Sequence, residues 1–430
     1  MSDKRPFLII GNSAAAVGTV AGIRKRDRDT PITLIAREAE HTYSRPLISY
    51  LLAGKVDEER MLYRGRDFYE KNGVDAVLGV EVTRIDAESR TVETDDGRTF
   101  PFGKLLIATG GAPVVPEDLP GTDARGVFTF TTWEDARRIK SHIETTDVKQ
   151  AVVVGGGLIG LKAVEALVEL GIRTTVVELA DRILSATFDL TASEVALDFL
   201  KGKGVEVHCR TTVSEVRGHE GRLAGVLLRD GTELPCELLI FAIGVVPDTR
   251  LARGAGIACG RGIVTDDGMQ TSIEGIYAAG DVVETRDLLT GARRPMPILP
   301  NAYRQGFIAG ANMVGGKLTS RGGLSMNAVD LCGLPTISVG ITSPEGEEYE
   351  ILSSLDDESG SYRKLVLRDN RIVGAIFVGR IDRAGIFTGL IREKVDVSGF
   401  KELLLSQDFG LISLPNEYRK HVVSGMGIEV

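Results

Sequence analysis

Cysteine is scarce in this sequence. Only Cys209, Cys236, Cys259 and Cys332 occur among the 430 residues. No two of them lie within four positions of each other, which excludes a C-x-x-C metal or redox pair. The first 208 residues contain no cysteine at all, so any chemistry placed there must proceed without a thiol.

Long apolar runs and excess positive charge are also missing. No apolar run approaches the roughly 20 residues that a membrane span needs. The N-terminal stretch has neither the apolar region nor the cleavage site of a signal peptide, so we expect a cytoplasmic protein. The net charge of −9 argues against a general nucleic-acid binder. A hydrophobic content of 43% in 430 residues predicts a globular chain of two or three domains.

What the sequence does contain is a dinucleotide fingerprint at residues 152–178. An apolar strand is followed by Gly155, Gly157 and Gly160 in the spacing G-x-G-x-x-G, and then by a helix that begins with Leu158 and Ile159. The first glycine allows a tight turn, the second allows a pyrophosphate to approach, and the third allows close helix packing. Glu178 ends the second strand, where a carboxylate can accept hydrogen bonds from a ribose diol.

A weaker copy of the same pattern opens the chain. A strand at residues 7–10 leads into Gly11, then Ser13 and the run Ala14-Ala15-Ala16, and the second strand is followed by Glu38. The spacing is G-x-S-x-x-A, which departs from the glycine pattern but keeps small residues. Each copy is followed later by a buried strand that ends in small residues, at 105–111 and at 238–244, which indicates a duplicated architecture.

The remaining segments predict how the chain is divided. Residues 293–300 read as a proline-rich loop, and a helix from Asn301 to Met313 follows with Asn301 as its N-cap. After residue 325, short strand-like segments with polar turns predict a separate α+β unit. The expected fold class is therefore α/β, with two Rossmann-like domains and a C-terminal α+β domain.

Six motifs in this order resemble the pyridine nucleotide–disulfide oxidoreductase superfamily, most closely its branch of rubredoxin reductases, nitrite-reductase flavin domains and NADH oxidase-like proteins. They are Gly11/Ser13/Ala16, Tyr43-Ser-Arg45-Pro46, Ala108-Thr109-Gly110, Gly155/Gly157/Gly160, Ala242-Ile-Gly244-Val-Val-Pro247 and Tyr277-Ala-Ala-Gly280-Asp281. The resemblance implies an FAD domain from residues 1–112 and 247–320, an NAD(P)H domain from 113–246, and an interface-type domain from 325–430.

The resemblance also implies site residues. Glu38 would hold the adenosine ribose of FAD, Asp281 would bind the ribityl chain, and the helix at Asn301 would point its positive end at the flavin. The implied FAD site is Gly11, Ser13, Ala14, Ala15, Ala16, Glu38, Arg45, Pro46, Val82, Ala108, Thr109, Gly110, Gly280, Asp281, Asn301 and Ala302. The implied NAD site is Gly155, Gly157, Leu158, Ile159, Gly160, Glu178 and Gly244.

Glu178 favours NADH over NADPH, because a 2′-phosphate beside that carboxylate would bring two anions to about 3–4 Å. Arg182 is the one nearby cation that could offset this repulsion.

Two departures from the family narrow the chemistry. The stretch 43–55, where the disulfide reductases and NADH peroxidases carry redox cysteines, has none here. The related reductases pair a Lys and a Glu beside flavin N5, and the matching residues here are Tyr50 and Lys162. Lys162 is therefore a candidate catalytic residue that supplies positive charge near N5. The alternative is that it pairs with Glu165, three positions along the same helix.

The resulting prediction is an FAD-dependent NADH:acceptor oxidoreductase, in which a hydride moves between NADH and FAD and electrons move between FAD and an iron–sulfur partner. The partner would be a small carrier protein of the rubredoxin or ferredoxin type, or the iron–sulfur subunit of a larger complex. Either direction of electron flow is compatible with these residues. The alternatives are an NADH oxidase or quinone reductase, and a redox-sensing interaction module. A homodimer is possible.

Overall fold

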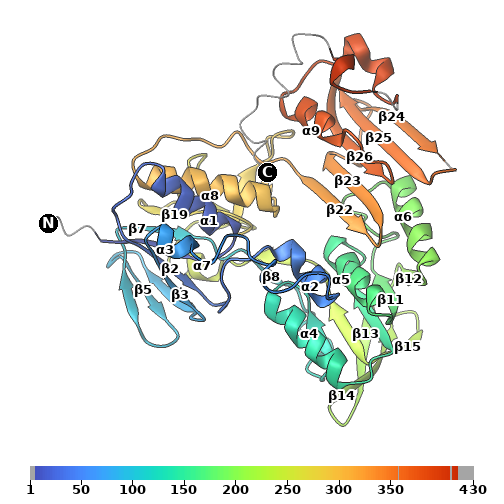
Figure 1. Ribbon diagram of the computed structural model, residues 1–430, viewed down its shortest axis with the longest axis horizontal. Coiled ribbons are helices and arrows are strands. Elements are labelled where there is room, and N and C mark those ends of the chain that lie inside the picture. The colour runs from blue at the N-terminus through green and yellow to red at the C-terminus, as the bar shows by residue number, and fades with distance from the viewer. Residues whose placement is uncertain (1–4, 357, 407–408, 415–430) are drawn as a thin grey trace. The chain divides into compact units, whose positions relative to one another are not determined.

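The computed structural model describes residues 5–356, 358–406 and 409–414 (Figure 1). They form two compact units. The first contains the described residues up to Val114 together with Thr131–Trp133 and Val245–Leu324. The second contains Val115–Phe130, Glu134–Gly244 and the described residues from Ser325 onward.

The first unit is built on a parallel sheet of five strands in the order β19-β7-β1-β2-β3. The strands that build it are short, apolar and largely buried, as expected for a sheet covered on both faces. Its strands and main helices are β1 (Phe7–Ile10), α1 (Ala14–Arg24), β2 (Ile32–Ala36), β3 (Val74–Leu78), β7 (Lys104–Ile107), β19 (Ile276–Ala278) and α8 (Leu299–Met313).

Smaller elements complete this unit. The strands β4, β5 and β6 form an antiparallel meander, β18, β20 and β21 form a second small sheet, and β8 pairs with β17. Their bounds, with those of the short helices, are η1 (Arg45–Leu47), α2 (Ile48–Leu52), α3 (Phe68–Lys71), β4 (Val82–Asp86), β5 (Thr91–Thr94), β6 (Thr99–Pro101), β8 (Gly111–Pro113), β17 (Val245–Pro247), α7 (Arg250–Gly254), β18 (Ile263–Val264), β20 (Val283–Arg286) and β21 (Arg293–Pro295).

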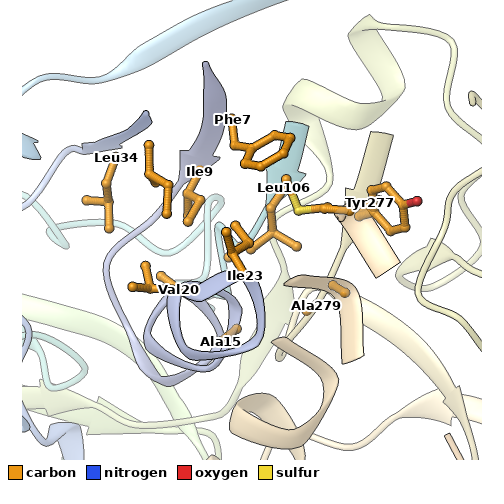
Figure 2. Close-up of a cluster of buried hydrophobic side chains, with 14 of the residues drawn as sticks. Phe7, Ile9, Ala15, Val20, Ile23, Leu34, Leu106, Tyr277 and Ala279 are labelled. Carbon is orange, nitrogen blue, oxygen red and sulfur yellow. The ribbon is translucent and has the colours of Figure 1, made fainter. Parts of the chain in front are cut away.

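One of the two core clusters of the first unit lies between the sheet and α1, and the other lies between the sheet and the β4–β6 meander with α7. Figure 2 shows Phe7, Ile9, Leu34 and Leu106 from the strands in one cluster with Val20 and Ile23 of α1. On its other side α1 packs closely on α8, because glycines replace side chains at the contact. A Cβ on Gly306 would lie 2.0 Å from the carbonyl oxygen of Ala15. The Thr19 hydroxyl donates to the carbonyl of Gly306 at 3.0 Å, which ties the two helices together.

The second unit has the same arrangement of a parallel sheet and an antiparallel meander. Its parallel sheet has the order β12-β11-β10-β16-β9. The central strand, its two neighbours and the antiparallel meander follow the same chain order as in the first unit, which confirms the predicted duplication. The elements are β9 (Val127–Thr129), α4 (Trp133–Thr145), β10 (Gln150–Val154), α5 (Leu158–Glu169), β11 (Arg173–Glu178), α6 (Leu190–Gly202), β12 (Glu206–Cys209), β13 (Val213–His219), β14 (Arg222–Leu228), β15 (Glu233–Pro235) and β16 (Leu238–Phe241).

The C-terminal part of this unit is an antiparallel sheet in the order β22-β23-β26-β25-β24, with α9 packed on β26. Its elements are β22 (Met326–Leu331), β23 (Leu334–Gly340), β24 (Glu350–Asp356), β25 (Ser361–Arg368), β26 (Arg371–Val378), α9 (Ala384–Arg392), η2 (Ser398–Leu403) and η3 (Leu411–Ser413). Asp189, the N-cap of α6, accepts hydrogen bonds from Tyr362 and Lys364 of β25, both at 2.8 Å. These bonds tie the C-terminal sheet to α6, which belongs to the part of the unit with the parallel sheet.

Two local predictions need correction. The helix predicted from Asn301 begins at Leu299, with Ile298 as its N-cap, because Pro300 is well tolerated in a first helical turn. The predicted loop at 293–300 contains the short strand β21. Among the described residues, no helix is both long enough and apolar enough to cross a membrane.

Candidate cofactor sites

The loop between β10 and α5 shows what its glycines do. Gly155 has a φ of +112°, and a Cβ there would lie 2.4 Å from the carbonyl oxygen of Ala242. A Cβ on Gly160 would lie 1.9 Å from the carbonyl oxygen of Gly155. Gly157 differs, because nothing lies within 4 Å of its Cβ position. Two glycines therefore let the turn and helix close, and the third leaves an open face at the N-terminus of α5.

Glu178 is held at this loop by two backbone hydrogen bonds. Its carboxylate accepts from the N–H of Gly156 at 2.6 Å and from the N–H of Ala180 at 2.7 Å. Leu179 beside it is 63% exposed, and Ile243, which follows β16 next to Gly155, is 41% exposed. A carboxylate, an open helix N-terminus and uncovered apolar side chains fit the ribose, the phosphates and the base of a dinucleotide.

The loop between β1 and α1 is closed in the same way. Gly11 has a φ of +108°, and a Cβ there would lie 2.2 Å from the carbonyl oxygen of Ala108. Ser13 is the N-cap of α1, but its side chain makes no capping hydrogen bond. Asn12 donates to the carbonyl of Glu40 at 3.0 Å and accepts from the Tyr69 hydroxyl at 2.8 Å. The loop after β2 is therefore fastened to the fingerprint loop.

Glu38 lies at the centre of a polar cluster. One carboxylate oxygen accepts from the Tyr43 hydroxyl and the other from Arg45. Arg45 also donates to the carbonyl of Thr131 at 2.9 Å, and Tyr43 accepts from the N–H of Trp133 at 3.0 Å. All five residues belong to the first unit.

Asp281 provides the second carboxylate of the candidate site in the first unit. Burial raises the pKa of Asp281, and the positive charge of Arg45 acts in the opposite direction. No hydrogen bond to this carboxylate is found among the described residues. Gly280 before it donates its N–H to Gln305 of α8 at 2.8 Å. A partly buried carboxylate without hydrogen-bond donors among the described residues fits the hydroxyl groups of a ribityl chain.

The start of α8 has unused hydrogen-bonding capacity. Its N-cap, Ile298, offers no side-chain cap, and the buried amide nitrogen of Asn301 has no hydrogen-bond partner among the described residues. Arg45 interacts electrostatically with both Glu38 and Asp281. An arginine that interacts with two carboxylates, one suited to a ribose and the other to a ribityl chain, fits the pyrophosphate that joins those groups in FAD. The first unit therefore fits FAD.

Other predicted residues are placed as follows. Thr109 donates to the carbonyl of Asp248 at 2.8 Å, and Gly110 and Gly244 have open space at their Cβ positions. Val82 begins β4, pairs with Thr94 in the meander, and belongs to a buried cluster that includes Ile10 and Ile107, the residues before Gly11 and Ala108. Ala14, Ala15 and Ala16 are buried in α1, Ala302 is buried in α8, and Pro46 is exposed in η1.

Lys162 lies on α5 and is largely buried. Its ammonium group forms an ion pair with Glu165 and donates to the carbonyl of Asp330 in β22 at 3.3 Å. The contact with Glu165 is the one expected from the alternative interpretation. A role beside flavin N5 stays a prediction.

Sequence reasoning missed the residues that position the others. Asn12, Tyr69, Trp133 and Gln305 each hydrogen-bond to a loop that carries a predicted site residue. Trp133 is the single tryptophan of the sequence, which is the only signal that could have drawn attention to it.

Two nucleotide loops on two duplicated parallel sheets define the class of flavoproteins with two dinucleotide-binding domains. The chain belongs to the pyridine nucleotide-disulphide oxidoreductase family, whose model matches residues 5–306. Residues 326–395 match the rubredoxin NAD+ reductase C-terminal domain. The chain is thus an NAD(P)H-dependent flavoprotein oxidoreductase with FAD and NAD(H) as cofactors, which confirms the predicted family, fold class and cofactors.

Relatives cover nearly all of the chain. It is 33% identical to the NADH-dependent phenylglyoxylate dehydrogenase subunit epsilon of Aromatoleum evansii, over 91% of this chain and 92% of that protein. It is 31% identical to the ferredoxin reductase component of chlorobenzene dioxygenase from Cupriavidus sp. (strain PS12), over 86% and 88%. Among solved structures, the covalent putidaredoxin reductase–putidaredoxin complex matches with a TM-score of 0.83 and 26% identity, over 91% and 94%.

Proposed function

We propose that this protein passes electrons between NADH and an iron–sulfur partner, which is either a small carrier protein or an iron–sulfur subunit of a larger complex. FAD, when bound, supplies hydride exchange with NADH and release of electrons one at a time. The first unit holds FAD through Glu38, Arg45, Asp281 and the start of α8. The second unit holds NADH through the Gly155 loop and Glu178, which favours NADH over NADPH.

The observation that carries the proposal is the absence of cysteine from the stretch 43–55, where the disulfide reductases carry their redox thiols. The stretch 43–55 has no cysteine, and Cys259 is the only cysteine in the first unit. Burial raises the pKa of Cys259. It also raises the pKa of Cys332 to about 11 and that of Cys236 to about 12. Because the thiolate is the reactive form, none of these thiols is suited to a redox relay. The acceptor must therefore take electrons from the flavin directly.

The relatives support the choice of partner. One is named as a subunit of an NADH-dependent dehydrogenase, and it matches this chain over nearly its full length. Another is named as a ferredoxin reductase component. A protein that works beside a separate electron-transfer component needs no thiol relay of its own.

An acceptor panel tests the proposal. The purified FAD-loaded protein is given NADH with rubredoxin, ferredoxin, a quinone or O₂, and ferricyanide serves as a control for the flavin half-reaction. We expect fast turnover with an iron–sulfur protein and slow O₂ consumption. Fast O₂ or quinone reduction would instead support the oxidase or quinone-reductase alternative. If only ferricyanide reacts, co-purification from the native source decides between a missing iron–sulfur subunit and a redox-sensing module.

A further inference from the structure

The cluster around Glu38 contains a hydroxyl group whose direction is determined. Tyr43 is 6% exposed, and its oxygen accepts the N–H of Trp133 at 3.0 Å. A backbone N–H can only donate, so the single proton of the phenol is left for Glu38. Burial raises the pKa of Tyr43, which keeps that proton in place at ordinary pH.

The Tyr43 ring is held independently of its hydroxyl. It meets the Trp133 ring edge-on, with centroids 5.3 Å apart and an angle of 80°. The Arg45 guanidinium lies 5.3 Å from the centroid of the Tyr43 ring. Removing only the hydroxyl should therefore leave the ring in position, which makes the effect of the hydroxyl separable from that of packing.

Tyr43 differs from Arg45 in what it can offer a cofactor. Arg45 has N–H groups beyond those bonded to Glu38 and Thr131, so it can bind a pyrophosphate itself. The Tyr43 hydroxyl already uses its proton and one lone pair within the protein. It therefore has no proton left to donate to a cofactor, and the group that it orients is the Glu38 carboxylate.

We propose that Tyr43 is a positioning residue for FAD, which fixes the Glu38 carboxylate for the adenosine ribose and anchors it to the Thr131–Trp133 segment. The proposal rests on the assignment of the first unit to FAD. A carboxylate held in its binding orientation before the cofactor arrives loses less side-chain freedom on binding, which raises affinity. The anchor is distant in sequence, because Trp133 lies 90 positions after Tyr43.

The test is a double-mutant cycle on FAD affinity, measured by titrating apo-protein with FAD. Tyr43→Phe keeps the ring and removes the hydroxyl, and Glu38→Gln removes the charge that the hydroxyl orients. We expect Tyr43→Phe to weaken FAD binding about tenfold in the wild-type background. In the Glu38→Gln background, Tyr43→Phe should weaken FAD binding much less, because the effects of substituting residues that act through one another are not additive.

Tyr362→Phe is the matched control. Tyr362 also donates its hydroxyl to a carboxylate, that of Asp189, but it belongs to the C-terminal sheet of the second unit. It should leave FAD affinity unchanged and combine additively with Glu38→Gln. An unshifted Trp133 emission maximum in apo Tyr43→Phe checks that the ring packing survives.

Additive losses for Tyr43→Phe and Glu38→Gln, or unchanged FAD affinity in Tyr43→Phe, would overturn the positioning role while leaving the proposed function intact. Failure of the wild-type apo-protein to bind FAD would instead refute the proposed function.

Discussion

At the residue scale, we predict that Glu178 of the second unit determines the preference for NADH over NADPH. Its carboxylate is not free to turn away, because the N–H groups of Gly156 and Ala180 hold both oxygens. A 2′-phosphate placed at about 3–4 Å from this fixed charge would be repelled. NADH has a hydroxyl there, which can donate to the same carboxylate.

The first prediction concerns Glu178→Ala. Loss of the ribose hydrogen bonds should lower kcat/KM for NADH about 10- to 100-fold, which corresponds to about 1–3 kcal/mol. The value of kcat/KM for NADPH should fall less, so the ratio of kcat/KM for NADH to that for NADPH should decrease. Steady-state kinetics with both nucleotides measure this ratio. Glu194→Ala, an exposed position on α6, is the control. An unchanged ratio would show that Glu178 does not select the nucleotide.

The second prediction concerns Lys162, whose proposed role and whose observed ion pair can be separated. Lys162→Met alone leaves the Glu165 carboxylate buried without its cation, which should cost several kcal/mol of stability. The double variant Lys162→Met/Glu165→Gln removes that cost. If Lys162 supplies charge for hydride transfer, stopped-flow traces should show slower flavin reduction by NADH in both variants. Unchanged rates would leave Lys162 with only its structural ion pair.

At the scale of elements, α1 and α8, the two helices of the proposed FAD site, pack closely on each other. Gly306 makes this approach possible, because a Cβ there would collide with the backbone of Ala15. The glycines of α8 are therefore required by packing, although glycine in a helix interior is otherwise unfavourable by about 0.5–1 kcal/mol relative to alanine.

The third prediction compares two helical glycine-to-alanine changes. Gly306→Ala should destabilise the apo-protein by about 1–3 kcal/mol, because the helices must separate to admit the methyl group. Gly385→Ala in α9 should be neutral or stabilising by up to about 1 kcal/mol, since nothing lies within 4 Å of its Cβ position. The urea midpoint of Gly306→Ala should therefore fall, whereas that of Gly385→Ala should stay unchanged or rise. Equal midpoints would contradict the packing role.

The elements that sequence could predict are those with local causes. The strand–loop–helix units at Gly11 and Gly155 follow from apolar runs and turn glycines, and both are present. The order of the C-terminal sheet, in which β23 pairs with β26, depends on contacts far apart in sequence and has no local signal. The Tyr43–Trp133 bond is hidden for the same reason. The first residue of α8 is Leu299 and not Asn301, the residue predicted because an asparagine before an apolar helix is typical of an N-cap.

At the scale of the whole molecule, the four cysteines are spread over unrelated positions. Cys236 is fully buried beside β16, and Cys332 occupies a hairpin turn with a φ of +55°. Burial raises the pKa of all four thiols, so each stays protonated near neutral pH. Together with the thiol-free stretch 43–55, this leads us to predict that no cysteine of this flavoprotein oxidoreductase takes part in electron transfer.

The fourth prediction is that a cysteine-free chain still works. Cys209→Ser, Cys259→Ser, Cys236→Ala and Cys332→Asn remove every thiol, and asparagine suits the left-handed backbone at 332. Cys236→Ala should cost about 1–2 kcal/mol of stability through the lost core volume. FAD content, NADH turnover and electron transfer to the iron–sulfur acceptor should stay close to those of the wild type. Loss of turnover in a folded, FAD-loaded variant would contradict direct transfer from the flavin, and restoring one cysteine at a time would then identify the thiol required.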